Sequence, residues 1–282
     1  MSGEPEILDP SELTLDQMRE ACWQAGNLSY LVLPHQRDVY DAFWAWQATK
    51  HKRSVRLAWA RAGLLYHHAW HWEIARRWGK TVLAMLIVIE FCIRRPGSTG
   101  LLCTAFQNSI AEIILKILRT VFEPDAPPGY CPIYRSSKGG EHELLWIPAV
   151  NSTIKLVGLD KHSDKTRGNY QDFCVVTEAG FVGLGKLLET YTGPITPQFR
   201  YRPWAWTIME SSTSPIPGHE FQTTFKRDAI GRGTHVLRTI DQADLTPEEI
   251  ELELTVMGGK DSALALREAI QTVHHCALNP PA

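Results

Sequence analysis

The tripeptide Gly79-Lys80-Thr81 joins two apolar segments in WEIARRWGKTVLAMLIVIEF. Glycine, lysine and a hydroxyl residue in this order are typical of a loop that binds phosphate. Backbone N–H groups at a helix N-terminus attract the anion, the lysine adds a positive charge, and the hydroxyl can ligate Mg²⁺. The full pattern also requires a glycine five residues before Gly79, where this chain has Ile74. The tripeptide alone is weak, because it arises by chance in roughly one chain of this length in ten to twenty.

Two more polar clusters follow apolar segments further along the chain. Glu178 comes directly after FCVVT, and Ser211, Ser212 and Thr213 come directly after WTIME. A carboxylate can orient or deprotonate an attacking water, and a group of hydroxyls can sense a γ-phosphate. Ligands of parallel sheets bind where the strands end at their carboxyl edges. Three clusters in this order therefore predict a nucleotide-binding site.

The surrounding segments alternate between strands and helices. The pattern predicts apolar strands at 72–75, 101–105, 173–181 and 205–215, and a hairpin over 143–159 that turns near Asn151 and Ser152. It predicts helices at 9–23, from Pro34, at 81–95, at 107–122 and from Pro247. The helix at 81–95 is apolar almost all round, so we expect it to be buried. Elements of this kind imply a mainly parallel sheet covered on both faces.

The first and last predicted helices carry start signals. Asp9, Pro10 and Ser11 open the first helix. In the last helix, Thr246 is the expected N-cap and Glu249 lies at the third helical position, which makes a capping box. The acidic residues of the last helix are therefore first-turn and solvent-face carboxylates rather than a metal cluster.

Composition indicates a folded protein of mixed charge. Of the 282 residues, 44% are hydrophobic and 21% are charged, and the formal net charge is −2. Any contact with nucleic acid must therefore come from a local basic patch. The six cysteines form no CxxC pair, which favours buried thiols in a reducing compartment over a metal cluster. The N-terminus lacks the apolar core of a signal peptide, and Glu90 interrupts the longest apolar run. We expect a soluble, intracellular protein without membrane contact.

Two histidine groups and one basic segment are further candidates for binding. The histidines at 67–71 and the His-His-Cys run at 274–276 do not complete a tetrahedral metal site, so metal binding is disfavoured. Arg53, Arg56 and Arg61 lie in a basic, aromatic segment and can contact DNA phosphates. A solvated helix face or a subunit contact explains these arginines equally well.

Three motifs, in this order, resemble those of the ATPase domain of tailed-phage large terminases, the motors that pump DNA into a procapsid. ARRWGKT is similar to the family's variant phosphate loop, in which arginines stand where other loops have glycine. KTRGNYQDFCVVTE is similar to its second acidic motif, which has Arg-Gly about ten residues before the acidic end of the strand. SSTSPIPGHEF resembles its coupling motif. The resemblance runs from about residue 30 to about residue 270.

The resemblance implies a role for each matching residue. Lys80 and Thr81 would bind the β- and γ-phosphates and Mg²⁺, Glu178 would be the catalytic carboxylate, and Ser212 and Thr213 would couple hydrolysis to movement. The implied nucleotide-binding residues are Gln36, Arg76, Arg77, Trp78, Gly79, Lys80 and Thr81.

Four of the implied residues have alternative explanations. Gln36 resembles the glutamine that reads adenine, but it is also an ordinary residue at the start of a helix. Arg76 or Arg77 can act as a catalytic arginine finger in cis, or the two can form a surface pair. Arg167 resembles the arginine that is offered to the γ-phosphate of a neighbouring subunit, but it can also hold the turn at Gly168 through a buried salt bridge.

The chain departs from the family at two points. Thr177 stands where the family has the aspartate that helps to hold Mg²⁺ through water. We therefore expect either a weakened metal site at Thr81 and Thr177 or slow hydrolysis. Members of the family also continue into a nuclease domain; we expect this chain to lack that domain and to have no nuclease activity.

Together, the residues and the resemblance predict an α/β P-loop fold of the RecA/ASCE type. The expected parts are an N-terminal helical extension at 1–30, an ATPase core at 31–230 and a small lid at 231–282. The expected activity is ATP hydrolysis with Mg²⁺, which drives double-stranded DNA into a procapsid. Expected partners are DNA, the portal protein, the small terminase subunit and further copies in a pentameric ring, in the host cytoplasm. The alternatives are a helicase-like translocase and a nucleotide-binding module with impaired hydrolysis; a nucleotide kinase fits less well.

Overall fold

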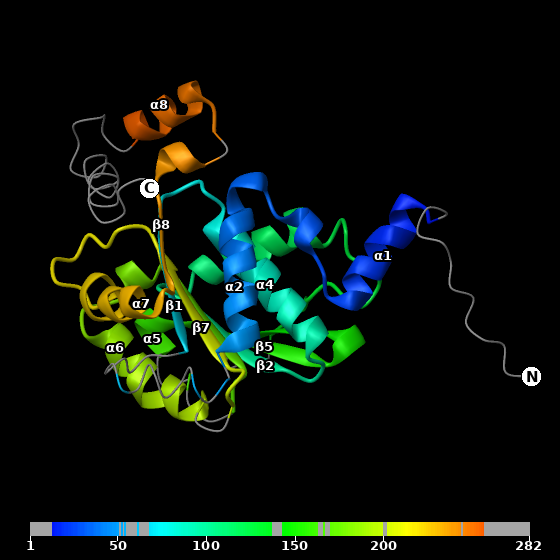
Figure 1. The fold of residues 1–282 in the computed structure, drawn as a ribbon, viewed down its shortest axis with the longest axis horizontal. Helices are drawn as coiled ribbons and strands as arrows, with labels where there is room; N and C mark the ends of the chain where they lie inside the picture. Colours follow the sequence, from blue (N-terminus) through cyan, green and yellow to red (C-terminus); the bar gives the residue numbers. More distant parts are fainter. Residues whose placement is uncertain are drawn as a thin grey trace, which may run out of the picture.

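A computed structural model describes residues 13–50, 52, 54, 61, 68–136, 143–162, 166, 170–199, 202–243 and 245–256. Within them, eight strands form one sheet in the order β3-β4-β5-β2-β6-β7-β1-β8 (Figure 1). The strands are β1 (Ala69–Ile74), β2 (Thr99–Thr104), β3 (Ile133–Ser136), β4 (Glu143–Ile147), β5 (Ser152–Gly158), β6 (Phe173–Thr177), β7 (Trp206–Ser211) and β8 (His235–Arg238).

The sheet is mainly parallel, as the sequence predicts. All pairs from β5 to β8 across the sheet are parallel, and only β3 and β4 run antiparallel to their neighbours. The strands β4 and β5 form the expected hairpin, and its turn contains Asn151 in the left-handed region at φ +51°. The parallel strands place the ends of β1, β6 and β7 at one edge.

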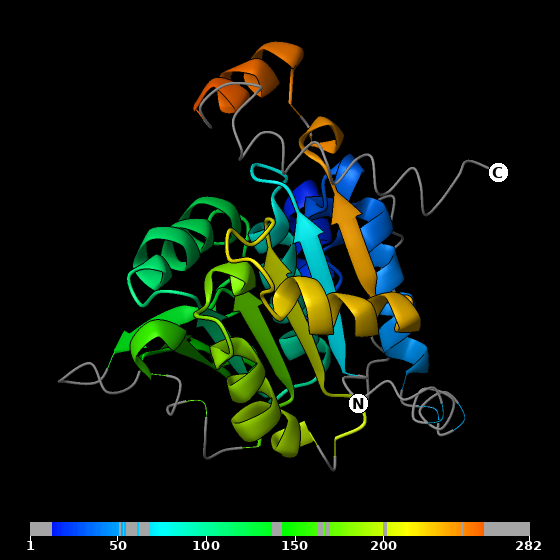
Figure 2. The same cartoon turned by 90° about the vertical axis from the view of Figure 1, so that its left-hand side faces the viewer.

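Helices cover both faces of the sheet (Figures 1 and 2). The α-helices are α1 (Leu15–Ala25), α2 (Arg37–Thr49), α4 (Lys80–Arg94), α5 (Leu159–His162), α6 (Lys186–Thr190), α7 (Lys226–Arg232) and α8 (Pro247–Val256). Short 3₁₀- and π-helices connect these elements: η2 (Ser29–Leu31), η3 (Pro34–Gln36), η4 (Ile110–Leu115), η5 (Leu118–Phe122), η6 (Pro148–Val150), η8 (Ala179–Phe181), η9 (Tyr191–Ile195), η10 (Thr196–Phe199), η11 (Phe221–Phe225) and η12 (Ile240–Gln242).

Two apolar cores lie on opposite faces of the sheet. One core joins α2, α4, η4 and η5 to inward side chains such as Trp72 and Val175. The other joins α6, η9 and η11 to side chains of the opposite face such as Cys174 and Met209. Neighbouring residues of β6 thus point into different cores, as the alternation of a strand requires. The helix α4 is buried along almost its whole length, as its sequence predicts. No helix in the part of the chain that the structure describes has both the length and the apolar character of a membrane span.

Several predicted element ends differ from the structure. The first helix begins at Leu15 behind a Thr14 capping box, while residues 9–12 lie outside the described ranges. The strand β1 begins three residues earlier than predicted, at Ala69. The segment 107–122 forms the wide-turned helices η4 and η5 rather than one regular α-helix. The strand β8 pairs with β1, so the sheet continues beyond residue 230, the predicted end of the ATPase core. The capping box of Thr246 and Glu249 in α8 is confirmed.

Glu90, in the middle of α4, connects the N-terminal helices to the core. Its buried carboxylate accepts hydrogen bonds from the backbone N–H of Leu28, the hydroxyl of Tyr40 (2.8 Å) and the indole of Trp44 (2.9 Å), and it pairs with Arg94 at 3.5 Å. Burial raises the pKa of Glu90 above its ordinary value, and the charge of Arg94 opposes that shift. The residue that interrupts the apolar run is therefore an anchor for α2.

Glu90→Ala is expected to lower the free energy of unfolding by about 3–5 kcal/mol, because it leaves two buried donors and one half-buried donor without an acceptor. Urea unfolding measures the loss, and Glu123→Ala at an exposed position is the control, with a change within about 0.5 kcal/mol. Because the folded-state pKa of Glu90 is raised, its contribution to stability is fully present at low pH and declines as pH rises through that pKa. The difference in the free energy of unfolding between wild type and Glu90→Ala should therefore decrease as pH rises. An increase of this difference with pH would contradict this account.

Candidate functional site

A cavity of about 780 Å³ lies at the carboxyl edge of the sheet, where β1, β6 and β7 end. Its walls include residues from all three polar clusters that the sequence predicts to meet. The polar and loop residues that line it are Arg76, Arg77, Gly79, Lys80, Thr81, Ser109, Glu178, Glu210 and Ser212. Apolar side chains, among them Phe106 and Phe181, complete the walls. The parallel topology thus brings together residues that lie more than 130 positions apart in sequence.

The loop between β1 and α4 turns sharply to bring the start of α4 to the cavity. Arg77 has φ +63° and Gly79 has φ +82°, the left-handed region that glycine tolerates best. A Cβ at Gly79 would lie 2.5 Å from the amide nitrogen of Gln36. The backbone N–H groups in the first turn of α4 have no partner within the helix. They can therefore bind an anion in the cavity, assisted by the helix dipole.

Gln36 holds this loop in place through hydrogen bonds to its backbone. Its side-chain nitrogen donates to the carbonyl oxygens of Trp78 (3.1 Å) and Gly79 (3.3 Å), and its oxygen accepts from the backbone N–H of Leu33 (3.3 Å). The side chain is buried and does not line the cavity. Trp78 is also buried and outside the lining. Gln36 thus has a positioning role that the sequence did not predict, and its adenine-reading role stays a prediction.

Lys80 and Thr81 face the cavity from the first turn of α4. The ammonium of Lys80 lies 3.5 Å from the carbonyl oxygen of Ala75, at the limit of hydrogen-bond distance. The hydroxyl of Thr81 donates to Oε1 of Glu210 at 2.6 Å. Burial raises the pKa of Glu210, whereas the charge of Lys80 and the hydrogen bond from Thr81 lower it. Glu210 is not among the residues predicted from the sequence, although it directly precedes the serine cluster at the end of β7.

Glu178 occupies a strained position at the end of β6. Its backbone has φ +54° and ψ +35°, a left-handed conformation that costs a residue with a Cβ about 1–2 kcal/mol. Its side chain is half-buried and lines the cavity, 3.4 Å from the hydroxyl of Ser109. Strain of this kind tends to persist where a side chain must be aimed at a functional site. The predicted carboxylate therefore lies where it can act on a ligand.

The strain at Glu178 predicts an unusual order of stability. The free energy of unfolding of Glu178→Gly should be about 1 kcal/mol higher than that of Glu178→Ala. Glycine has no Cβ, so it adopts the left-handed backbone without a steric penalty. Chemical denaturation of the two variants measures the difference. Glu189, which is exposed and lies in a helix, gives the matched pair. There the free energy of unfolding of Glu189→Ala should instead be about 1 kcal/mol higher than that of Glu189→Gly. The same order at both positions would rule out strain at Glu178.

Thr177, the predicted second metal residue, points away from the cavity lining. Its hydroxyl donates to the carbonyl oxygen of Cys103 at 3.4 Å, and the side chain is buried. Thr177 is absent from the residues that line the cavity. This placement gives no support to the expectation that Thr177 helps Thr81 to hold a metal ion, because a hydroxyl directed at a neighbouring strand is not available to a ligand in the cavity.

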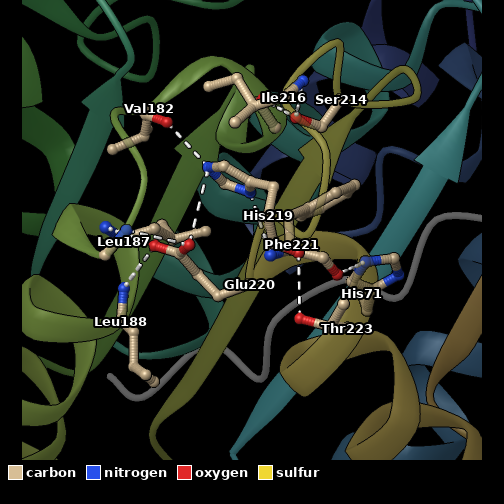
Figure 3. A network of polar contacts seen from close by, with 12 residues as sticks. His71, Val182, Leu187, Leu188, Ser214, Ile216, His219, Glu220, Phe221 and Thr223 are labelled. Atoms are coloured by element: carbon tan, nitrogen blue, oxygen red, sulfur yellow. Dashed lines mark hydrogen bonds and ion pairs between the residues drawn. The ribbon is translucent and has the colours of Figure 1, made fainter.

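The loop after β7 is joined to the segment after Glu178 by a network of polar contacts (Figure 3). The hydroxyl of Ser214 donates to the carbonyl oxygen of Gly180 (2.5 Å), and the ring nitrogen Nε2 of His219 contacts the carbonyl oxygen of Val182 (2.7 Å). The carboxylate of Glu220 accepts from three backbone N–H groups at the start of α6, those of Gly185, Leu187 and Leu188. The two loops are thus held together as one unit.

The predicted coupling residues sit at the start of this unit. Ser212 lines the cavity, whereas Thr213 does not. The hydroxyl oxygen of Thr213 is buried and has no hydrogen-bond partner within the described residues. A ligand that moved Ser212 would act on the loop that carries Ser214 and His219, and so on the segment that follows Glu178.

The remaining candidates fall into two groups. Arg76 and Arg77 are exposed and line the cavity, so either can approach a bound ligand, and Arg167 lies outside the described residues. His71 contacts His235 (3.0 Å) and the carbonyl oxygen of Phe221 (2.7 Å), which is a structural role. His67 and 274–276 also lie outside the described ranges. Among residues with described positions, no group of three His, Cys, Asp or Glu could hold a metal ion.

Comparisons with known proteins rest on structure, since no family model and no curated protein matches the chain. The large terminase of the thermophilic bacteriophage D6E has a TM-score of 0.52 and 11% identity, over 66% of this chain and 44% of that one. The chain shares its fold with a phage large terminase. The ATPase domain of the Thermus phage P74-26 large terminase gives 0.49 and 16%, over 77% and 92%. The HK97 bacteriophage large terminase gives 0.46 and 17%, over 73% and 43%. The fold shared with the D6E large terminase, together with the mainly parallel sheet, confirms the predicted α/β fold of the P-loop type.

Proposed function

We propose that this chain is an ATPase and acts as the motor domain of a viral DNA-packaging terminase. The observation that carries the proposal is the meeting of the phosphate loop, Glu178 and Ser212 around one cavity at the carboxyl edge of a terminase-like sheet. A binding site for phosphate, a carboxylate and a hydroxyl sensor are the parts that nucleotide hydrolysis needs.

The residues around the cavity have distinct tasks in this mechanism. The first turn of α4 and Lys80 bind the phosphates through N–H groups and a positive charge. Glu178 orients a water molecule for in-line attack on the γ-phosphate. Arg76 or Arg77 stabilises charge that develops on the transferred group. Thr81 would hold a Mg²⁺ ion, which would neutralise negative charge on the phosphates.

The network around Glu220 connects hydrolysis to movement. Ser212 senses the γ-phosphate, and the loop behind it is bonded to the segment 180–188. Figure 2 places α8 beyond the carboxyl ends of β1 and β8, which suits the lid expected at the end of the chain. Release of phosphate would loosen this lid and shift the surface that grips DNA. Arg167 of one copy would serve the site of its neighbour in a pentameric ring.

The proposed partners follow from this role. The ring would sit on the portal protein, receive double-stranded DNA from the small terminase subunit, and work in the host cytoplasm. The overall charge of −2 leaves DNA binding to a local basic surface.

The experiment that tests the proposal is steady-state phosphate release from ATP with MgCl₂, with and without double-stranded DNA, beside a nucleotide-binding titration. We expect nucleotide binding and turnover that requires MgCl₂ and increases with double-stranded DNA. Binding without turnover in any condition would favour the nucleotide-binding module instead. Unwinding of a duplex with a single-stranded tail would favour the helicase-like translocase. The absence of nucleotide binding would overturn the proposal.

A further inference from the structure

Glu210 is a buried carboxylate at the cavity to which the proposed mechanism gives no task. It is fully buried, yet it lines the cavity at the end of β7. Its Oε1 accepts the hydrogen bond from Thr81, whereas its Oε2 makes no hydrogen bond within the described residues. A buried carboxylate oxygen without a partner is costly. This atom therefore points to a ligand that is bound in the cavity.

The register of the sheet places Glu210 beside Thr177. The two residues are Cα partners in the parallel pair of β6 and β7. Partners in neighbouring strands lie on the same face of the sheet, and the strands are about 4.8 Å apart. A carboxylate at 210 therefore occupies the place next to position 177, where the resembling family carries an aspartate. The hydroxyl of Thr177 is directed at Cys103, so Glu210 meets no competing side chain from that position.

The contact with Thr81 links Glu210 to the phosphate loop. Because the Thr81 hydroxyl donates its hydrogen to Glu210, the lone pairs of its oxygen remain available to a cation. Mg²⁺ prefers oxygen ligands and usually keeps several water molecules, so it needs one or two protein groups and the phosphates of a nucleotide. A hydroxyl with an adjacent carboxylate meets that need without a cluster of acidic residues.

We propose that Glu210 takes over the task of the missing aspartate and, through water, holds the Mg²⁺ of a nucleotide whose metal is ligated by Thr81. The inference rests on the proposed nucleotide site. It gives this chain a metal site built on β7 instead of β6. The alternative is that Glu210 only fixes the rotamer of Thr81, which would make it a positioning residue without any effect on metal affinity.

The test is the MgCl₂ dependence of ADP binding to the whole chain, measured by calorimetry from EDTA to excess MgCl₂. In wild type, MgCl₂ is expected to tighten ADP binding with a defined midpoint concentration. Glu210→Gln keeps the size of the side chain and can still accept from Thr81. Its midpoint is expected to rise about tenfold or more, the usual effect of losing a group behind a metal ligand. Its affinity for ADP in EDTA should increase, because a negative charge next to the phosphates is removed.

Two further variants separate metal binding from a structural effect. Thr177→Asp in the Glu210→Gln background returns a carboxylate to the neighbouring strand, and it is expected to restore the midpoint toward that of wild type. Glu73→Gln is the matched control, because Glu73 is a buried glutamate on the adjacent strand β1 that pairs with Lys226 outside the cavity lining. Its midpoint should equal that of wild type. Thermal unfolding of each variant confirms that it folds.

The outcomes distinguish this inference from the proposed function. If MgCl₂ tightens ADP binding to wild type and the midpoint MgCl₂ concentration is the same in Glu210→Gln, the proposed role of Glu210 is overturned. The ATPase proposal then remains intact. If Glu210→Gln raises the midpoint and the added Thr177→Asp does not lower it, the claim that a carboxylate at position 210 replaces one at position 177 is overturned. Wild type that binds no ADP in either condition would overturn the proposed nucleotide site, and the inference with it.

Discussion

Glu178→Gln is expected to lower the steady-state rate of ATP hydrolysis about 10³-fold while nucleotide binding is kept. The carboxamide has the shape of the carboxylate but cannot accept a proton from the attacking water, and the loss of a general base typically costs 10²–10⁴-fold. Glu178 contacts no part of the phosphate loop among its described hydrogen bonds, so the phosphate-binding groups should remain in place. Phosphate release and a titration with a slowly hydrolysed ATP analogue measure the two properties separately.

The exposed Glu189, in α6, provides the control for this change. Glu189→Gln makes the same chemical change at an exposed position and should leave turnover within about twofold of wild type, since exposed substitutions have little effect. Turnover that survives in Glu178→Gln would show that another group activates the water. Loss of nucleotide binding in Glu178→Gln would instead assign Glu178 to the binding of phosphate or metal.

The sheet could be predicted because its central strands are buried on both faces. FCVVT and WTIME are nearly continuous apolar runs, and a strand of that kind must lie inside a parallel sheet. The start of β1 could not be predicted, because it contains His71. The burial of this histidine depends on Phe221 and His235, which contribute its partners from distant parts of the chain. Local patterns cannot show such long-range compensation.

The candidate site was predictable to the extent that it depends on strand ends. Lys80, Glu178 and Ser212 all follow apolar runs, and parallel topology alone brings them to one edge. Glu210 also lies at a strand end, but its place beside Thr177 could not be found this way, because it depends on the register between β6 and β7. The support of the phosphate loop by Gln36 depends on a contact across more than 40 residues. Register and tertiary contact are properties of the folded chain, so they require the structure.

The same distinction applies to the coupling motif. SSTSPIPGHEF resembles the family's motif by its letters, but its physical content lies in the contacts of Ser214, His219 and Glu220 with the segment that follows Glu178 (Figure 3). Glu220 satisfies three N–H groups at the start of α6, where a helix has unpaired donors and favours a negative charge. The motif therefore joins the loop of Ser212, the proposed sensor of the γ-phosphate, to the segment that follows Glu178, the proposed catalytic carboxylate.

Lys80→Met is expected to weaken nucleotide binding about 10–100-fold and to reduce turnover further, about 10²-fold or more at saturating ATP. A hydrogen bond to a charged group contributes about 1.5–3 kcal/mol, which sets the loss of affinity. Charge that develops on the phosphates in the transition state makes the loss in turnover larger. Methionine keeps the apolar stem of the side chain, so the start of α4 should remain packed. Calorimetry with ADP and phosphate release at saturating ATP measure the two effects.

The pattern of the two losses identifies the role of the lysine. Lys80 donates only weakly to Ala75, so its ammonium can turn to a phosphate with little loss of protein contact. Lys116→Met, on an exposed position outside the cavity lining, is the control and should change neither property. Equal losses in Lys80→Met and Lys116→Met would show that general positive charge attracts the nucleotide. The other outcome is a loss in Lys80→Met alone that is larger for turnover than for affinity. It would mean that the loop binds the transition state better than the ground state, as catalysis by a phosphate loop requires.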